Sequence, residues 1–179
     1  HRIMGLLAAV ACIVAAITMR SPLMIFFDLT SLFVFVVGTL GLLAITYGRG
    51  ALELRSAFRA WLLGADGGNK TPKDHLRIAG MAHDFGEFSI LMGTIIMNIG
   101  HTQMLNNWSD SGKMFPALAV AVLSPLYGLL VHTFIALPLC LHHRRLAGED
   151  ESPRLRLLGV ISINAGCGLF MWFLVLSDA

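Results

Sequence analysis

The most prominent pattern in the chain is a series of long apolar runs separated by short polar segments. A helix that crosses a bilayer needs about 20 mainly apolar residues, and its backbone groups must be satisfied within the segment. The pattern therefore predicts an all-α fold: a polytopic membrane helical bundle with about five transmembrane helices, in a single integral membrane domain over residues 1–179. The expected spans are residues 3–19, 23–47, 85–105, 114–141 and 155–176.

The longest polar connection, the short cytoplasmic segment 48–80, has a helical pattern of its own. Within residues 51–63, apolar side chains such as Leu52, Ala57 and Trp61 recur at helical spacing and charged side chains fall between them, which predicts an amphipathic helix. Such a helix either extends the second span into the cytoplasm or lies on the membrane surface. The segment as a whole is too short to form a core of its own.

Composition and charge support a membrane location and give an orientation. Of the residues, 56% are hydrophobic and 13% are charged, whereas a soluble domain carries about 25% charged residues. Of the 13 Lys and Arg residues, eleven lie on one side of the predicted bundle and two on the other, and the side with eleven includes the N-terminus. This split predicts a multi-pass membrane protein with a cytoplasmic N-terminus and a C-terminus on the far side. No basic stripe with interleaved aromatics is present, so no nucleic acid partner is expected.

The third predicted span carries a polar stripe. Four residues at spacings of seven, four and three share one face of a helix: Glu87, Thr94, Asn98 and His101. A polar face on an otherwise apolar membrane helix must contact protein or water. Two interpretations stay open, hydrogen bonding between helices and the lining of an ion pathway. Asp84 lies one turn before Glu87, and the two carboxylates form either an interfacial face or an acidic mouth that collects cations.

The histidines raise the question of a redox cofactor. His132 lies inside the fourth predicted span, where a packed, hydrogen-bonded residue and a haem ligand are the two interpretations. His101 lies about 20 Å from it in depth at 1.5 Å per residue, too far to share a haem. His83 matches the depth of His132 better, so that pair stays open. No catalytic triad, phosphate-binding loop or paired catalytic carboxylates appear, and the three cysteines are far apart. We therefore expect no enzyme, no metal site and no cofactor.

Two segments resemble the MotA branch of the MotA/TolQ/ExbB proton channel family. Residues 26–42 contain an Asp, a Ser three residues later and further Gly residues, which resembles the second span of the family. Within residues 86–141, Gly93 and Thr94 resemble the Gly-Thr of its third span, and the later letters LYG and FIALP resemble its fourth. The resemblance covers about 75 of the 179 residues.

The resemblance implies an ion-driven rotary motor of the stator type. Five copies would form a homopentamer around a single-span MotB/ExbD-like partner, whose membrane Asp carries the ion, and ion flow would be converted into mechanical work. The third and fourth spans would line the path, where hydroxyl groups can relay a proton or hold a cation. With the polar stripe included, the expected ion-pathway residues are Thr94, Ser124, Asn98 and Glu87. The residues expected to shape the pore or its helices are Pro125, Tyr127, Gly128 and Pro138.

The chain also departs from the family pattern. Sodium-type members have two adjacent hydroxyl residues directly before Leu-Tyr-Gly, where this chain has Ser124 and Pro125, so protons are favoured over sodium as the coupling ion. The large cytoplasmic domain of flagellar stators is replaced by residues 48–80, and a fifth span is added, so the chain resembles a minimal form with another task. The alternative functions are a non-conducting structural or binding membrane subunit and a haem or quinone redox subunit.

Overall fold

The part of the chain that the structure describes is built from helices. The computed structural model describes residues 2–18, 28–64 and 70–149, and these residues contain no β-strand, as an all-α fold requires. The expected span 155–176 lies outside the described residues. In chain order the elements are α1 (Arg2–Thr18), α2 (Leu29–Tyr47), η2 (Gly48–Gly50), α3 (Ala51–Leu63), α4 (Pro72–Asn106), α5 (Ser111–Val131), η3 (His132–Ala136) and α6 (Leu137–Leu146).

The longest element is α4, which contains 35 residues and at 1.5 Å per residue is about 50 Å long. A capping box starts it: the Thr71 hydroxyl accepts a hydrogen bond from the Asp74 N–H at 3.3 Å, and the Asp74 carboxylate accepts one from the Thr71 N–H at 3.0 Å. Hydrogen bonds from the hydroxyl and backbone of Thr71 lower the pKa of Asp74 below its ordinary value. The helix therefore begins well before residue 85, where the third span is expected.

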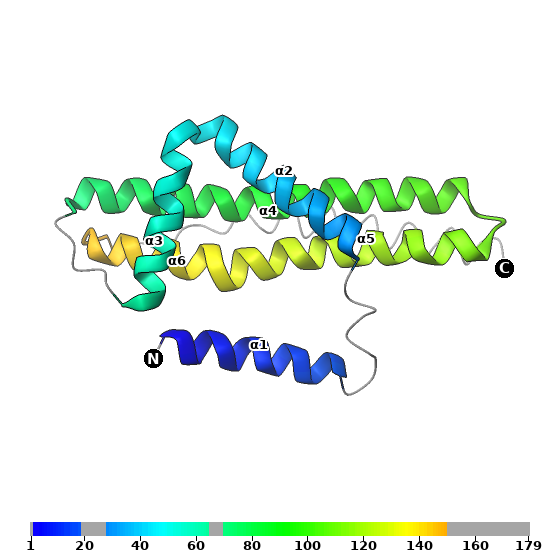
Figure 1. Cartoon of the computed structure of the whole chain (residues 1–179), viewed down its shortest axis with the longest axis horizontal. Coiled ribbons are helices and arrows are strands. Elements are labelled where there is room, and N and C mark those ends of the chain that lie inside the picture. Colours follow the sequence, from blue (N-terminus) through cyan, green and yellow to red (C-terminus); the bar gives the residue numbers. More distant parts are fainter. Residues whose placement is uncertain (1, 19–27, 65–69, 150–179) are drawn as a thin grey trace.

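The long helix α4 and the helices α5 and α6 run antiparallel and form a hairpin (Figure 1). Glycines allow their backbones to approach closely. A Cβ atom added at Gly93 would lie 2.7 Å from the carbonyl oxygen of Ser124, and one added at Gly128 would lie 2.6 Å from that of Ser89. Because the obstructing atoms belong to the backbone, any larger residue at these positions would force the two helices apart.

The second arm of the hairpin is one continuous helix, Ser111–Leu146. Its middle section, η3, is a π-helical turn, after which the Leu137 N–H donates to the carbonyl of His132. Pro138 follows directly, and in a regular α-helix its ring would clash with the carbonyl four residues earlier. The π turn ends just before this proline, and the helix continues past it as α6.

A bend at η2 separates α3 from α2. Gly48 has a φ of +55°, a region that favours glycine, and the chain turns there so that α3 crosses the hairpin steeply (Figure 1). Leu54, Ala57 and Trp61 are buried against α4 and α6, whereas Leu52 is 68% exposed. The amphipathic helix is therefore not a straight extension of α2. It covers one end of the hairpin.

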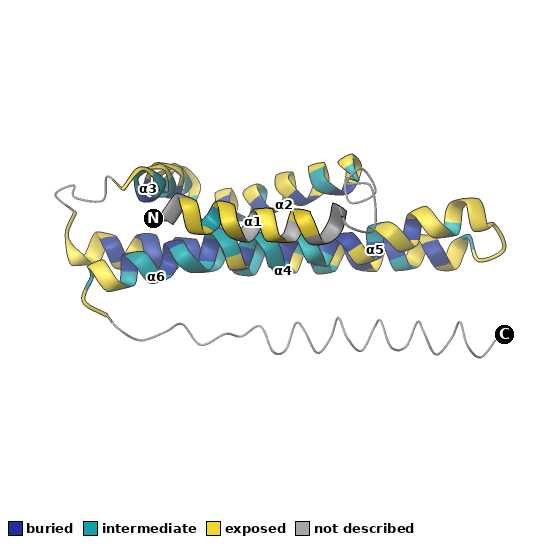
Figure 2. Ribbon diagram, turned by 90° about the horizontal axis from the view of Figure 1, so that it is seen from below, coloured by how far each residue is buried: buried dark blue, intermediate teal, exposed yellow. Residues whose placement is uncertain are grey.

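Among the described residues, two helical segments are long and apolar enough to cross a membrane, judged by length and composition: Leu29–Leu63 and Ser111–Leu146. Much of α2 and α5 is exposed in the single chain (Figure 2). Large apolar side chains such as Phe33 and Val122 are among the exposed ones, as expected for a surface that contacts lipid or another subunit. The described part of the chain thus supports a helical membrane protein, and the count of five spans stays a prediction.

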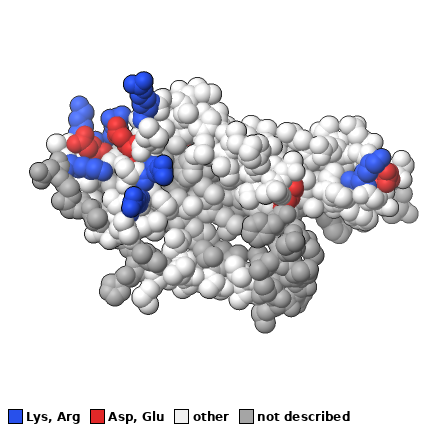
Figure 3. All heavy atoms as spheres, in the orientation of Figure 1, with Lys and Arg blue, Asp and Glu red and all other residues white. Residues whose placement is uncertain are grey.

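Charged side chains gather at the two ends of the hairpin on the face shown in Figure 3. Most lie over α3 and the start of α4, a smaller group lies at the opposite end, beside the turn between α4 and α5, and some acidic atoms are visible between the two groups. Between these ends, residues 88–109 and 114–143 contain no Asp, Glu, Lys or Arg. In the shorter of these stretches, the helical residues 88–106 are about 28 Å long at 1.5 Å per residue, close to the roughly 30 Å hydrocarbon core of a bilayer.

The close contact of α4 with α5 predicts that Gly128→Ala destabilises the protein by about 1–3 kcal/mol, because the added methyl group overlaps the backbone at Ser89. Thermal unfolding in detergent, followed by circular dichroism, measures the effect. Gly80→Ala is the matched control, since a Cβ at Gly80 meets no atom within 4 Å, and it should leave the melting temperature unchanged or raise it. Equal losses in both variants would contradict the packing described here.

Candidate functional site

The polar stripe of α4 lies on a face that the rest of the described chain leaves partly open. Glu87, Thr94 and His101 are half-buried and Asn98 is exposed. The Thr94 hydroxyl donates to the Ile90 carbonyl at 3.0 Å, and the Asn98 amide donates to the Thr94 carbonyl at 2.8 Å. These two hydrogen bonds run along α4 itself. The face toward α5 is occupied by buried small and apolar residues, so the stripe lies outside the main contact between the two helices.

Ser124 occupies the inside of the hairpin. Its side chain is fully buried, and its hydroxyl donates to the carbonyl of Val120 at 2.7 Å. The backbone of Ser124 and Pro125 packs directly on Gly93. Thr94 follows Gly93, so both predicted hydroxyls lie at one level of the hairpin. They differ in environment, because Thr94 remains partly exposed while Ser124 is enclosed.

Tyr127 connects α5 to the start of α2. Its hydroxyl accepts a hydrogen bond from the Asp28 N–H at 3.4 Å, and its ring centroid lies 6.2 Å from that of Phe35. The Asp28 carboxylate caps α2 by accepting from the Thr30 N–H at 3.2 Å and from the Ser31 hydroxyl. These contacts fix where α2 begins relative to the hairpin.

A cluster of ionisable side chains lies where the charged part of α4 gives way to its uncharged part. His83 Nδ1 is 3.6 Å from Asp84 Oδ1, and His83 Nε2 is 3.8 Å from Glu87 Oε1. The Tyr47 hydroxyl on α2 donates to the other carboxylate oxygen of Asp84. The three ionisable residues are partly exposed, and one potential ligand atom from each lies within 4.8 Å of the others. The acidic pair expected from the sequence, Asp84 and Glu87, thus forms a cluster with His83.

His132 lies directly on the backbone of α4. Its side chain is 5% exposed. A Cβ atom added at Gly86 would clash with its Nδ1 atom and would lie 2.8 Å from the Cβ of Ala136. Because the ring packs on α4 without a gap, no porphyrin fits between His132 and His83 in this arrangement. Sequence reasoning singled out both histidines but not Gly86, whose absent side chain makes room for the ring.

A second histidine pair joins the start of α4 to the end of α6. The Nδ1 atoms of His75 and His143 are 2.9 Å apart, and their ring centroids are 5.2 Å apart in a stacked arrangement. His142 meets the edge of His143 with centroids 5.3 Å apart. Sequence reasoning missed this pair because its members are 68 positions apart and no motif marks either. Its place at the buried base of the hairpin indicates a structural contact.

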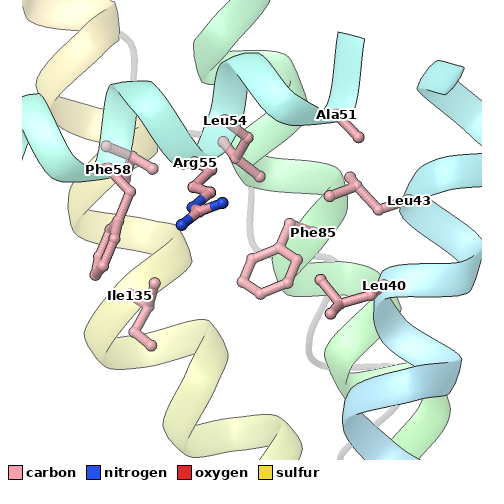
Figure 4. A pocket seen from close by; sticks show the side chains of 9 residues that line it. Leu40, Leu43, Ala51, Leu54, Arg55, Phe58, Phe85 and Ile135 are labelled. Atoms are coloured by element: carbon pink, nitrogen blue, oxygen red, sulfur yellow. The ribbon is translucent and has the colours of Figure 1, made fainter. Parts of the chain in front are cut away.

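An open cavity of about 250 Å³ lies among α2, α3, α4 and the second arm of the hairpin. Figure 4 shows Leu40, Phe58, Phe85 and Ile135 around it, with Arg55 as the one charged residue in its lining. The cavity is lined by no nucleophile and no acid–base pair. It suits an apolar group and supports no chemical reaction.

Comparison with known proteins gives one partial similarity. No family model matches the chain. Chemotaxis protein PomA of Vibrio alginolyticus is 32% identical to it over 98 residues, which are 54% of this chain and 38% of that protein. The chain therefore spans well under half the length of this curated relative. The described helices and this similarity are compatible with a MotA-like helical membrane protein.

The cap of α2 predicts that Asp28→Ala destabilises the protein by about 1 kcal/mol, because the first N–H groups of the helix lose their acceptor. Asp28→Asn should restore most of the loss, since an amide oxygen can accept the same hydrogen bond. Thr30→Ala is the control, because it keeps the backbone N–H that the cap uses. Thermal unfolding in detergent compares the variants, and an Asp28→Ala protein as stable as Thr30→Ala would contradict the capping role.

Proposed function

We propose that the chain is the ring-forming subunit of an ion-driven membrane motor of the stator type, with protons as the coupling ion. Five copies surround a single-span, MotB/ExbD-like partner that carries a membrane Asp. The complex lies in a bacterial inner membrane with the N-terminus of this chain in the cytoplasm. In this role the chain is a channel subunit, not an enzyme, and it converts ion flow into mechanical work.

The observation that carries the proposal is the partly open polar stripe on α4. A polar face on a membrane helix is stable only where it contacts water or protein. The face of α4 that carries Gly93 and Gly100 is filled by the backbone contact with α5. The stripe lies about 100° around the helix from that face, so it is available to a partner or to a second copy. The exposure of Asn98, together with its hydrogen bond within its own helix, favours the lining of a path over a contact between α4 and α5.

The surroundings of the two hydroxyls favour protons over sodium. A sodium ion in a narrow path needs several oxygen atoms to replace its hydration shell. Ser124 is enclosed and hydrogen-bonded within its helix, and Pro125 supplies no second hydroxyl. Thr94 is the better exposed of the two hydroxyls, and a hydroxyl that both donates and accepts can pass on a proton. A membrane potential supplies about 2.3 kcal/mol per charge per 100 mV for such a transfer.

The exposed apolar faces of α2 and α5 support assembly into a ring. Phe33, Val37 and Leu40 on α2 are exposed, as are Leu118 and Val122 on α5. Helices in a membrane associate through close packing rather than through exclusion of water. These faces therefore suit both lipid and neighbouring copies of the chain.

A non-conducting binding subunit is the second candidate function. The apolar cavity beside Arg55 favours it, because such a cavity can hold an apolar ligand in a protein that conducts no ions. The two candidates differ in whether ions cross the membrane, and flux measurements separate them.

The pentamer predicts a particle that contains five copies of the chain when the complex is purified in mild detergent. Native mass spectrometry counts both subunits directly. A chain that is monomeric or dimeric with its single-span partner bound would contradict the ring.

The ion pathway predicts that Thr94→Ala lowers proton flux through the reconstituted complex at least about tenfold, because a relay group is removed. Thr46→Ala is the matched control. The Thr46 hydroxyl donates to the carbonyl four residues earlier, that of Leu42, at 2.9 Å, just as the Thr94 hydroxyl donates to that of Ile90, but Thr46 lies on α2 and outside the proposed pathway. Proton flux into vesicles is measured with a pH-sensitive dye, and unchanged flux in Thr94→Ala would contradict the pathway.

The same measurement tests the identity of the coupling ion. Proton flux should persist when potassium replaces sodium, and a sodium requirement would contradict the proton assignment.

A further inference from the structure

The open cavity among α2, α3, α4 and the second arm of the hairpin combines an apolar wall with a single cation. Leu40, Phe85 and Ile135 contribute apolar side chains from three different elements, and Arg55 on α3 is the one charged residue in the lining. Figure 4 shows the Arg55 side chain directed into the space between Phe58 and Phe85. A cavity of this composition suits a ligand that is both apolar and anionic.

The charge of Arg55 is not neutralised within the part of the chain that the structure describes. Arg77 pairs with Glu53 at 3.4 Å, whereas no described carboxylate forms an ion pair with Arg55. Arg59 follows four residues later and lies on the same side of α3. A planar guanidinium binds a phosphate through two parallel hydrogen bonds. Arg55 therefore offers its charge to an anionic group from outside the chain, and Arg59 adds a second charge one turn away.

The cavity lies where the charged part of the hairpin meets its uncharged part. Phe85 precedes the uncharged residues 88–109 of the first arm by three positions, and Ile135 lies within the uncharged residues 114–143 of the second. In a bilayer this is the level at which lipid phosphates meet acyl chains. The predicted orientation puts this end on the cytoplasmic side, where basic pockets between membrane helices bind the head groups of anionic lipids.

The size of the cavity suits part of a long molecule rather than a whole small ligand. Its volume is about 250 Å³, below the roughly 300–1,000 Å³ of pockets that enclose a drug-sized molecule. The cavity is open, and Leu40 in its wall is 52% exposed. A ligand can therefore fill the cavity with one segment and continue along the exposed apolar face of α2, as the acyl chain of a lipid would.

We propose that the cavity binds an anionic phospholipid, with one acyl chain against Leu40, Phe85 and Ile135 and the phosphate on the guanidinium of Arg55. An acyl chain in a bilayer is already in an apolar environment, so its packing in the cavity distinguishes little between lipids. Arg55 supplies the preference for an anionic head group. The site requires a membrane but neither a pentamer nor ion conduction, so it goes beyond the proposed motor function.

The test compares the retention of two lipids by the full chain, purified in mild detergent and analysed by native mass spectrometry. Phosphatidylglycerol and phosphatidylcholine with identical acyl chains are added in equal amounts. Each copy of the unmodified chain should retain one phosphatidylglycerol, in about fivefold preference over phosphatidylcholine, which is the gain that one basic residue gives at an anionic membrane surface. Equal retention of the two lipids would overturn the proposal, as would a co-purified ligand with the mass of a free fatty acid.

Two variants separate a specific contact from a general attraction to positive charge. Arg55→Gln should lower the retention of phosphatidylglycerol about fivefold, to the level of phosphatidylcholine. Arg77→Gln is the matched control, because it removes one positive charge from a side chain that pairs with Glu53 and does not line the cavity. It should retain both lipids as the unmodified chain does. Equal losses in the two variants would mean that net charge alone attracts the lipid, and would overturn the site.

A second pair of variants tests the apolar part of the site. Ala51→Leu adds a larger side chain to the cavity wall and should lower the retention of both lipids to a similar extent. Ala60→Leu is the matched control, since Ala60 is half-buried on the same helix, as Ala51 is, but does not line the cavity. Unchanged retention in Ala51→Leu would contradict the placement of the acyl chain.

Thermal unfolding of the unmodified chain covers the case in which a variant does not fold. A ligand that binds only the folded state stabilises it, so phosphatidylglycerol should raise the melting temperature more than phosphatidylcholine does. Equal shifts would overturn the contact with the head group. A lipid retained by the single chain but absent from a larger assembly would mean that a neighbouring copy fills the cavity, and would also overturn the proposal. No readout is proton flux, so failure of the lipid site and failure of the motor proposal are distinguishable.

Discussion

Direct contact between the backbones of α4 and α5 determines most of the described structure. At Gly93, Gly100 and Gly128 a Cβ atom would lie 2.6–2.7 Å from backbone atoms of the opposite helix, so the helices are as close as their main chains allow. This closeness encloses Ser124, directs the polar stripe of α4 away from the hairpin and lays His132 on Gly86. The candidate pathway depends on it.

Features set by periodicity were predictable from the sequence. Apolar runs of sufficient length indicate membrane helices, and α3 occupies residues 51–63, where an amphipathic helix is expected. The stripe through Thr94 and Asn98 follows from helical spacing alone, and its partly open position agrees with a polar face that needs water or protein. The resemblance to the MotA branch placed Thr94 and Ser124 on adjacent helices, which the hairpin brings to one level.

Features that depend on register between helices could not be predicted. The contacts of Tyr127 with Asp28 and of His75 with His143 join residues 99 and 68 positions apart, and nothing local marks them. The start of α4 at Pro72 was also not predicted, for a different reason. Its first turns are polar, so hydropathy places the span near residue 85, whereas the capping box at Thr71 marks the true beginning. The capping residues Thr71 and Asp74 are visible in the sequence, but the ends of a membrane helix are predicted mainly from the length of its apolar run.

The π turn at residues 132–136 sets the helical phase of everything that follows it. Buried positions in this arm recur in steps of four, and in an α-helix such positions drift around the axis by about 40° per step. They include Gly128, His132, Ala136 and Cys140. The wider turn rotates less per residue and cancels part of that drift. One continuous helix can therefore follow α4 along the whole hairpin. If the same residues formed a regular α-helical turn instead, α6 would rotate by roughly the 100° of one residue and its buried side chains would turn outward.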